Sequence, residues 1–213
     1  MKPSLDNAYE RVRRAEQHLA AIKRRLPALG GPVRYWRENR QGVAAFERVV
    51  GSDITGVPAI FSILVGEGIY NLRAALDYLV YELAILDSGH IQYGTRFPIE
   101  DTEKGWKKHL ATFLNGLSVE HQAAIKRLQP CAGCDWVKVL RELSDPDKHR
   151  TLTVIRLRPL VQQARQPPAR RSVAMHSQVT ANIAFDDGRL VTETLQELQE
   201  EIALVLDSFQ PEF

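Results

Sequence analysis

The chain has 213 residues, of which 44% are hydrophobic and 25% charged, a composition that is ordinary for one globular domain with its own core. No apolar run approaches the roughly 20 residues of a membrane helix. Met1 and Lys2 are not followed by the apolar stretch of a secretory signal, and two cysteines are too few for a disulfide scaffold. We therefore expect a cytoplasmic protein without membrane contact. The net charge of +2 does not by itself indicate a polyanionic partner.

The N-terminal quarter predicts a helix followed by a hairpin. Apolar residues in the first 26 positions recur at steps of three and four, which indicates an amphipathic helix that Ser4 caps and Pro27 ends. Residues 33–50 hold two runs rich in β-branched and aromatic residues on either side of a glycine-containing turn, which predicts a hairpin. A helix over 43–50 is the competing interpretation of the second run.

The strongest predicted element is a helix over residues 59–87, which begins after Pro58. Large aliphatic residues between Ile63 and Leu83 recur at helical spacing, so that they share one face. Tyrosines, carboxylates and an amide on the opposite face indicate a partly buried polar surface, packed on another element or on a second subunit. This opposite face consists of Glu67, Tyr70, Asn71, Ala74, Tyr78, Tyr81 and Glu82.

The remaining elements predict the fold class. Consecutive strands without crossover helices favour an antiparallel sheet. We therefore predict a single α+β domain over 1–213, in which a helical layer around the long central helix packs beside a small antiparallel sheet. Its parts are the hairpin 33–50, a helical block 58–145 with short helices at 102–114, 118–128 and 135–143, strands within 151–192, and a C-terminal helix 194–209.

The polar side of the long helix, with its edges, is the first candidate site. Arg73 and Asp77 stand four residues apart, so they can pair across one helical turn. Arg73 is the candidate catalytic group, and the candidate binding residues are Glu67, Asn71, Asp77 and Tyr78. In the alternative interpretation, the Arg73–Asp77 pair only fixes the packing of the helix.

Three short motifs carry a family resemblance. They are Asn-Leu-Arg-Ala-Ala-Leu-Asp-Tyr at 71–78, Phe-Pro-Ile at 97–99 and Asp-Lys-His-Arg at 147–150. The chain resembles a bacterial family of uncharacterised proteins with an Asn-Leu-Arg-x-x-Leu-Asp-His stretch, a Phe-Pro-Ile segment and a later Asp-Lys-His-Arg. An arginine followed five positions later by a histidine on a helix is also similar to the signature of HEPN domains.

The HEPN resemblance implies a helical, dimeric protein associated with RNA. In active members, arginine stabilises phosphate charge and histidine transfers a proton, without a metal. Arg73 matches the arginine, but Tyr78 stands where the histidine would be. A tyrosine with an ordinary pKa of about 10 is a poor proton shuttle at neutral pH. The resemblance therefore implies degraded or absent ribonuclease activity.

The second candidate site is the segment 145–150, which we place between a helix end and a strand start, where polar side chains can gather. His149 is a candidate general base, while Asp147 and Lys148 are candidate binding residues. We predict that His149 lies near Arg73 or Glu67. The alternative is that His149 caps the preceding helix or bonds to the neighbouring strand.

The cysteines at 131 and 134 are the third candidate. Their spacing allows a redox pair, half of a zinc site, or two thiols in a turn, and a following helix would lower a thiol pKa. No second Cys-x-x-Cys is present. The chain also lacks a Gly-x-Gly-x-x-Gly motif, a Walker loop, a nucleophile elbow and a His-Glu-x-x-His motif. We therefore expect no metal and no cofactor.

Two classes of function follow from these patterns. The more specific is an HEPN-like, RNA-associated protein with degraded or absent ribonuclease activity. The alternative is a non-enzymatic protein, which either forms a homo-oligomer such as a homodimer through its tyrosine face or binds a small ligand. The ligand pocket would lie between the long helix and the sheet, floored by Glu67, Asn71 and His149.

Overall fold

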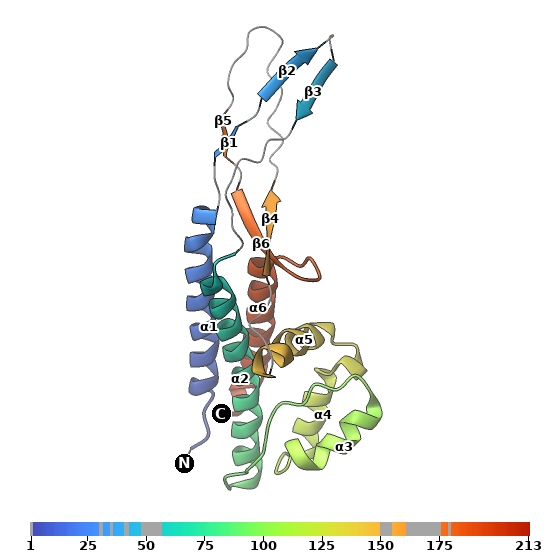
Figure 1. Ribbon diagram of the computed structural model, residues 1–213. Helices are drawn as coiled ribbons and strands as arrows, with labels where there is room; N and C mark the ends of the chain where they lie inside the picture. Colours follow the sequence, from blue (N-terminus) through green and yellow to red (C-terminus); the bar gives the residue numbers. More distant parts are fainter. Residues whose placement is uncertain are drawn as a thin grey trace.

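The computed structural model describes residues 2–29, 32–34, 36–40, 43–47, 57–149, 155–160, 176–178 and 180–213; within 32–47, 146–149, 155–160 and 176–181, it describes the backbone only. Of the residues whose side chains are also described, 74% are helical. The prediction of an α+β fold with a helical layer beside an antiparallel sheet is therefore wrong, and the protein is mostly helical. The physical reason is that the apolar faces of the helices are covered by other helices rather than by a sheet (Figure 1).

Six α-helices and three short 3-10 turns make up this helical part. The helix of 59–87 that the sequence predicts is observed over almost the same residues. The elements are α1 (Asp6–Arg25), η1 (Leu26–Leu29), α2 (Ala59–Ser88), α3 (Glu103–Phe113), α4 (Val119–Arg127), η2 (Pro130–Ala132), α5 (Asp135–His149), α6 (Val191–Phe209) and η3 (Gln210–Glu212).

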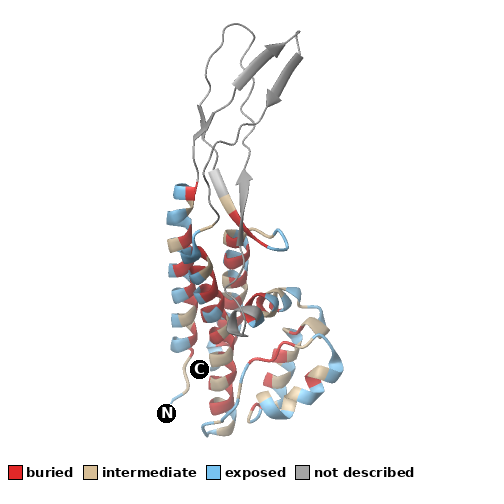
Figure 2. Ribbon diagram, in the orientation of Figure 1, coloured by how far each residue is buried: buried red, intermediate tan, exposed pale blue. Residues whose placement is uncertain are grey.

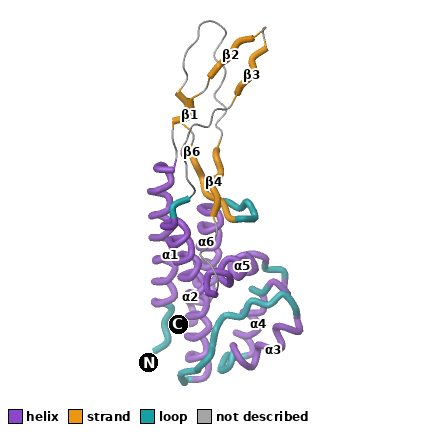
Figure 3. The backbone as a smooth tube through the Cα atoms, in the orientation of Figure 1, coloured by secondary structure: helices purple, strands orange, loops and turns teal. Residues whose placement is uncertain are grey.

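The described strands are short and pair only two at a time, as Figure 3 shows. β2 pairs antiparallel with β3 inside the segment 33–50, and β4 pairs antiparallel with β6 from Ile155↔Phe185 to Leu160↔Thr180. β1 pairs antiparallel with β5. The strands are β1 (Pro32–Arg34), β2 (Trp36–Arg40), β3 (Val43–Glu47), β4 (Ile155–Leu160), β5 (His176–Gln178) and β6 (Thr180–Phe185).

Three long helices, α1, α2 and α6, lie side by side and enclose the main core (Figure 1). The Tyr9 hydroxyl of α1 donates to Asp207 of α6 at 2.7 Å, and Lys23 donates to Gln196 at 3.0 Å. Because the start of α1 contacts the end of α6, these two helices are antiparallel. At Gly68 of α2, an added Cβ would lie 3.9 Å from both α1 and α6, so the three helices approach closely there.

The long helix α2 is buried on most of its circumference, because α1, α5 and α6 surround it (Figure 2). The prediction that one flank is apolar and the other polar is therefore too simple. Ile63, assigned to the apolar face, is 40% exposed, whereas Asn71 and Glu82 of the polar face are buried. A helix that is apolar nearly all round is typical of the centre of a core.

By length and composition alone, α2 is also a helix that could cross a membrane. Within the fold, however, 61% of its apolar window is buried by other parts of the protein. The core helix of a globular protein passes the same test of length and composition. The apolar character of α2 is therefore accounted for by its central position.

The helices α3, α4 and α5 lie beside the C-terminal half of α2 (Figure 1). Thr102 caps α3 by accepting from the Gly105 amide, and Ser118 caps α4 by accepting from the His121 amide. The helix α5 continues to His149, beyond the end predicted at 143. The expected placement of 145–150 in a loop before a strand is thus wrong for 145–149, which form the last turn of α5.

Candidate functional site

Arg73 and Asp77 hold the backbone of Phe97 between them. Asp77 Oδ1 accepts the Phe97 amide at 2.9 Å, and Arg73 Nη2 donates to the Phe97 carbonyl oxygen. The two side chains lie close enough to pair, with Nη2 and Oδ1 3.7 Å apart. Both polar backbone groups of Phe97, which lies outside any helix or strand, are thus bound by one turn of α2. We call this arrangement, formed by Arg73, Asp77 and Phe97, the Phe97 clamp.

The clamp is part of a longer arrangement that replaces sheet hydrogen bonds around residues 96–101. Arg141 Nη1 donates to the Ile99 carbonyl at 3.2 Å, and the Glu100 amide donates to Gln129 at 3.0 Å. The Cys131 amide donates to the Glu100 carbonyl at 3.0 Å. Pro98 has no amide to satisfy. The Phe97 amide and carbonyl and the Ile99 carbonyl are therefore bonded by side chains of α2 and α5 rather than by a neighbouring strand.

The clamp places the Arg73 guanidinium in the interior, where its side chain is only 11% exposed. Burial lowers the pKa of Arg73 from its ordinary value, the Asp77 and Asp145 carboxylates oppose this, and the Arg96 charge adds to it. Nη1 is buried without a hydrogen-bond partner among the described residues. Arg73 therefore relies on the Asp77 and Asp145 carboxylates for charge compensation, and its guanidinium is largely withdrawn from solvent.

A second cluster forms around Arg11 of α1, which is not among the site residues predicted from the sequence. Arg11 Nη1 donates to Asn71 Oδ1 at 3.1 Å, and Nη2 donates to the Tyr78 hydroxyl at 2.9 Å. The Arg11 Cζ also lies 5.2 Å from the Tyr78 ring centroid and 5.9 Å from that of Tyr70. The side-chain Nδ2 of Asn71 donates in turn to the backbone carbonyl of Glu67 at 2.7 Å. Asn71 and Tyr78 thus join α2 to α1.

The five residues predicted on α2 therefore do not form one site. Arg73 and Asp77 face Phe97, whereas Asn71 and Tyr78 face α1. Glu67 lies on the α1 side as well, with its Oε2 3.3 Å from Nδ1 of the buried His18.

The predicted residues Asp147, Lys148 and His149 lie at the end of α5, where the structure describes the backbone only. The prediction that the His149 side chain lies near Arg73 or Glu67 falls outside the described residues. Asp145, two positions before Asp147, acts electrostatically on Arg73, so the start of the segment 145–150 does lie beside the clamp.

The Cys131 and Cys134 thiols are free and half-buried. Burial raises the pKa of both, with a further increase from Glu103 at Cys131 and from Glu201 at Cys134. The sequence-based expectation of a lowered thiol pKa is therefore wrong, because burial and nearby carboxylates outweigh the helix that follows. Among the described residues, no group of three or more histidine, cysteine and carboxylate side chains could hold a metal ion.

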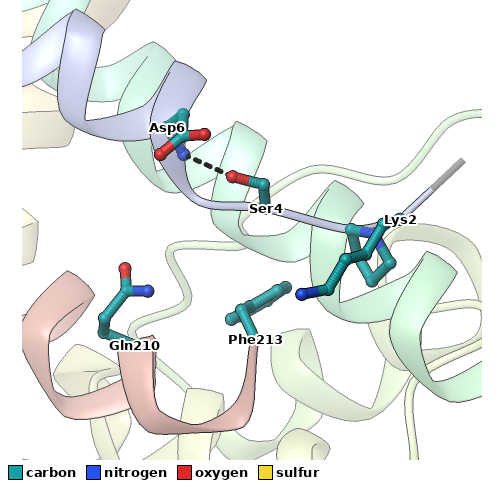
Figure 4. A pocket seen from close by; sticks show the side chains of 6 residues that line it. Lys2, Ser4, Asp6, Gln210 and Phe213 are labelled. Carbon is teal, nitrogen blue, oxygen red and sulfur yellow. Dashed lines mark hydrogen bonds between the residues drawn. The ribbon is translucent and has the colours of Figure 1, made fainter.

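A pocket of about 350 Å³ lies between the N-terminal segment and the last turn, η3 (Figure 4). In this view the Lys2 side chain extends toward Phe213, and Ser4 Oγ accepts the Asp6 amide at 3.1 Å. None of the residues predicted as a site contributes to its lining. The lining residues are Lys2, Pro3, Ser4, Asp6, Gln210 and Phe213.

Comparison of the chain with protein-family models, with curated proteins and with solved structures returns no match. The resemblance based on the three motifs therefore stays a prediction. The geometry nevertheless gives two of the motifs a physical role, because Arg73 and Asp77 of the first bind Phe97 of the second.

Proposed function

We propose that this protein is a non-enzymatic helical interaction protein that pairs with a second copy of itself through the outward side of α2. The observation that supports the non-enzymatic part of this proposal most directly is the Phe97 clamp. Arg73 and Asp77, the charged pair on α2 that the sequence suggests for a catalytic site, bind the backbone of another segment. A group committed to such a contact is a positioning residue rather than an acid, a base or a phosphate ligand.

The outward side of α2 carries large side chains that the chain itself leaves uncovered. Ile63 is 40% exposed and Tyr70 is 53% exposed, although α2 is otherwise a core helix. The residues along this side follow alternating steps of three and four, the spacing by which one helix packs along another. We call this set the outer strip; it consists of the exposed residues Ile60, Ile63, Glu67 and Tyr70.

A second copy of the chain is the occupant that the outer strip favours. Aromatic and aliphatic side chains at Tyr70 and Ile63 are the types that anchor protein interfaces. The formal net charge of only +2 means that two copies repel each other weakly.

The molar mass of the protein in solution tests this proposal. We expect a dimer by light scattering or sedimentation at concentrations up to about 100 μM, and a monomer for Tyr70→Glu. The matched control is Tyr93→Glu, because Tyr93 is 88% exposed and lies outside the outer strip; this variant should remain a dimer. A monomeric unaltered protein, or a Tyr70→Glu variant that stays dimeric, would contradict the proposal.

A second candidate function is RNA association without catalysis, and the pairing of Arg11 with Tyr70 favours it. An exposed aromatic ring beside a guanidinium is a combination that stacks a base and contacts a phosphate. Fluorescence anisotropy with a single-stranded RNA at low salt tests this candidate. We expect binding that weakens with added salt and with Tyr70→Ala. Undetectable binding at low salt would eliminate it.

A further inference from the structure

His121 of α4 lies between two carboxylates from distant parts of the chain. Its Nδ1 is 2.7 Å from Asp87 Oδ2, near the end of α2, and its Nε2 is 2.5 Å from Glu212 Oε2 in η3. The residue is buried, and its ring lies tilted against Phe209, with the ring centroids 6.1 Å apart. One imidazole therefore joins three elements that are separated by 34 and 91 positions in the sequence.

The two contacts depend on the protonation state of His121. A neutral imidazole carries one N–H and one lone pair, so it can donate to only one of two carboxylates. The other contact would then set a nitrogen lone pair against a carboxylate oxygen. Both contacts are favourable only when both ring nitrogens carry a proton, as in the imidazolium ion.

The charges that surround His121 favour that ion. Burial of the ring lowers the pKa of His121, but the hydrogen bonds and charges of Asp87 and Glu212 outweigh it, so the pKa is raised overall. Asp87 is presented by α2 and Glu212 by η3, while α6 presents the uncharged Phe209. No other described ionisable group contributes to this shift.

The two carboxylates are not equally fixed. The Asp87 side chain is 14% exposed and also accepts the amide of Ser118, the cap of α4, at 2.6 Å. The Glu212 side chain is 42% exposed, and its contact with His121 is the one hydrogen bond that the described residues provide for it. When His121 loses its second proton, the contact with Glu212 is therefore the one that breaks.

We propose that protonation of His121 latches the turn Gln210–Glu212 onto α2 and α4, and that deprotonation releases it. The same turn forms one wall of the pocket between η3 and the N-terminal segment (Figure 4). Release of the turn therefore removes one side of this pocket. The latch is a pH-sensitive device of the monomer, and it does not rest on pairing through the outer strip.

Nuclear magnetic resonance of the full chain tests the latch. The imidazole resonances of His121 report its titration, and hydrogen exchange of the Phe213 amide, which donates to Gln210, reports closure of the turn. We expect the protection of this amide, corrected for intrinsic exchange, to fall several-fold as His121 deprotonates. Glu212→Gln should lower the His121 pKa and remove the pH dependence of protection.

The matched control is Glu197→Gln, which replaces an exposed glutamate of α6 outside the latch; it should leave both readouts unchanged. Constant Phe213 protection throughout the His121 titration would overturn the proposal, as would a His121 titration that does not respond to Glu212→Gln. Because Glu212 lies at the surface end of the contact, its substitution tests the latch without removing a core residue.

Discussion

The amide of Phe97 donates to Asp77 Oδ1 at 2.9 Å, while the carbonyl of the same residue accepts from Arg73 Nη2. Two side chains four positions apart on α2 thus satisfy both backbone groups of a buried residue that lies outside any helix or strand. This relationship explains why an arginine and an aspartate at this spacing accompany a Phe-Pro-Ile segment in the same chain. It gives both side chains a structural role in holding Phe97.

The first prediction concerns this clamp. Asp77→Ala removes the acceptor of a buried amide and the ion-pair partner of the buried Arg73, which keeps only the more distant Asp145 carboxylate. We expect the free energy of unfolding to fall by about 2 to 3 kcal/mol, which chemical denaturation measures.

The control for the clamp is Glu16→Ala, which removes an exposed carboxylate from α1 and should change the free energy of unfolding by less than about 0.5 kcal/mol. If Asp77→Ala lowers the free energy of unfolding no more than this control does, the clamp does not stabilise the fold. A stable Asp77→Ala variant that had lost a measurable activity would instead restore a functional role for the pair.

Local signals in the sequence were sufficient to locate the helices. Pro58 begins α2, and Gly89, with a φ of 73°, ends it in the left-handed conformation that glycine adopts readily. The caps at Thr102 and Ser118 are the residue types that favour helix starts. The end of α5 was misjudged because the helix continues through Pro146, a residue that usually ends one.

The grouping of the site residues was harder to predict, because it depends on partners far away in the sequence. Steps of seven place Asn71 and Tyr78 on one stripe of α2, whereas Arg73 and Asp77 lie on another. The partner Arg11 is 60 positions from Asn71. A signal did exist, since Arg11 stands at helical spacing between the apolar residues Ala8 and Ala15 of α1. A charged residue at such a position is commonly one that bonds between helices.

The second prediction follows from this bridge. Arg11→Met keeps much of the apolar stem but removes donors to Asn71 and Tyr78. We expect a loss of about 1 to 2 kcal/mol in the free energy of unfolding. Arg13→Met is the matched control, because among the described residues Arg13 pairs with the exposed Glu10 on the same helix; it should change the free energy of unfolding by no more than about 0.5 kcal/mol. Equal losses in the free energy of unfolding for the two variants would show that the Arg11 contacts with Asn71 and Tyr78 do not stabilise the fold.

The third prediction concerns helix packing at Gly68. A Cβ added there meets His18 and Leu195 at 3.9 Å, an ordinary van der Waals distance. Alanine also has a higher helix propensity than glycine, so Gly68→Ala should stabilise the protein by about 0.5 to 1 kcal/mol in thermal or chemical unfolding.

Gly105→Ala in α3 provides the contrast to Gly68→Ala. An added Cβ there would collide with Glu100 Oε2, and Glu100 Oε1 contacts His109 Nδ1 at 2.5 Å. We therefore expect no stabilisation from Gly105→Ala. A destabilised Gly68→Ala variant would show that α1 and α6 approach α2 more closely than the structure indicates.

The last prediction is a pH dependence that originates at His18, which is buried between α1, α2 and α6. Burial lowers the pKa of His18, the Glu67 carboxylate opposes this and the Arg14 charge adds to it, with a lowered pKa as the result. The unfolded chain therefore binds this proton more readily than the folded protein does. The contribution of His18 to stability is present above the ordinary histidine pKa and is lost as pH falls through the lowered, folded-state value.

Denaturation between about pH 8 and about pH 5 measures this effect as a slope of the free energy of unfolding against pH. His18→Leu should flatten the acidic side of that profile, whatever its effect on the absolute stability. His90→Gln is the control, because His90 is exposed, and it should leave the slope unchanged. The His121 latch acts in the opposite direction, since its raised pKa makes its contribution disappear as pH rises. An unchanged acidic slope in His18→Leu would show that another group causes the loss of stability at low pH.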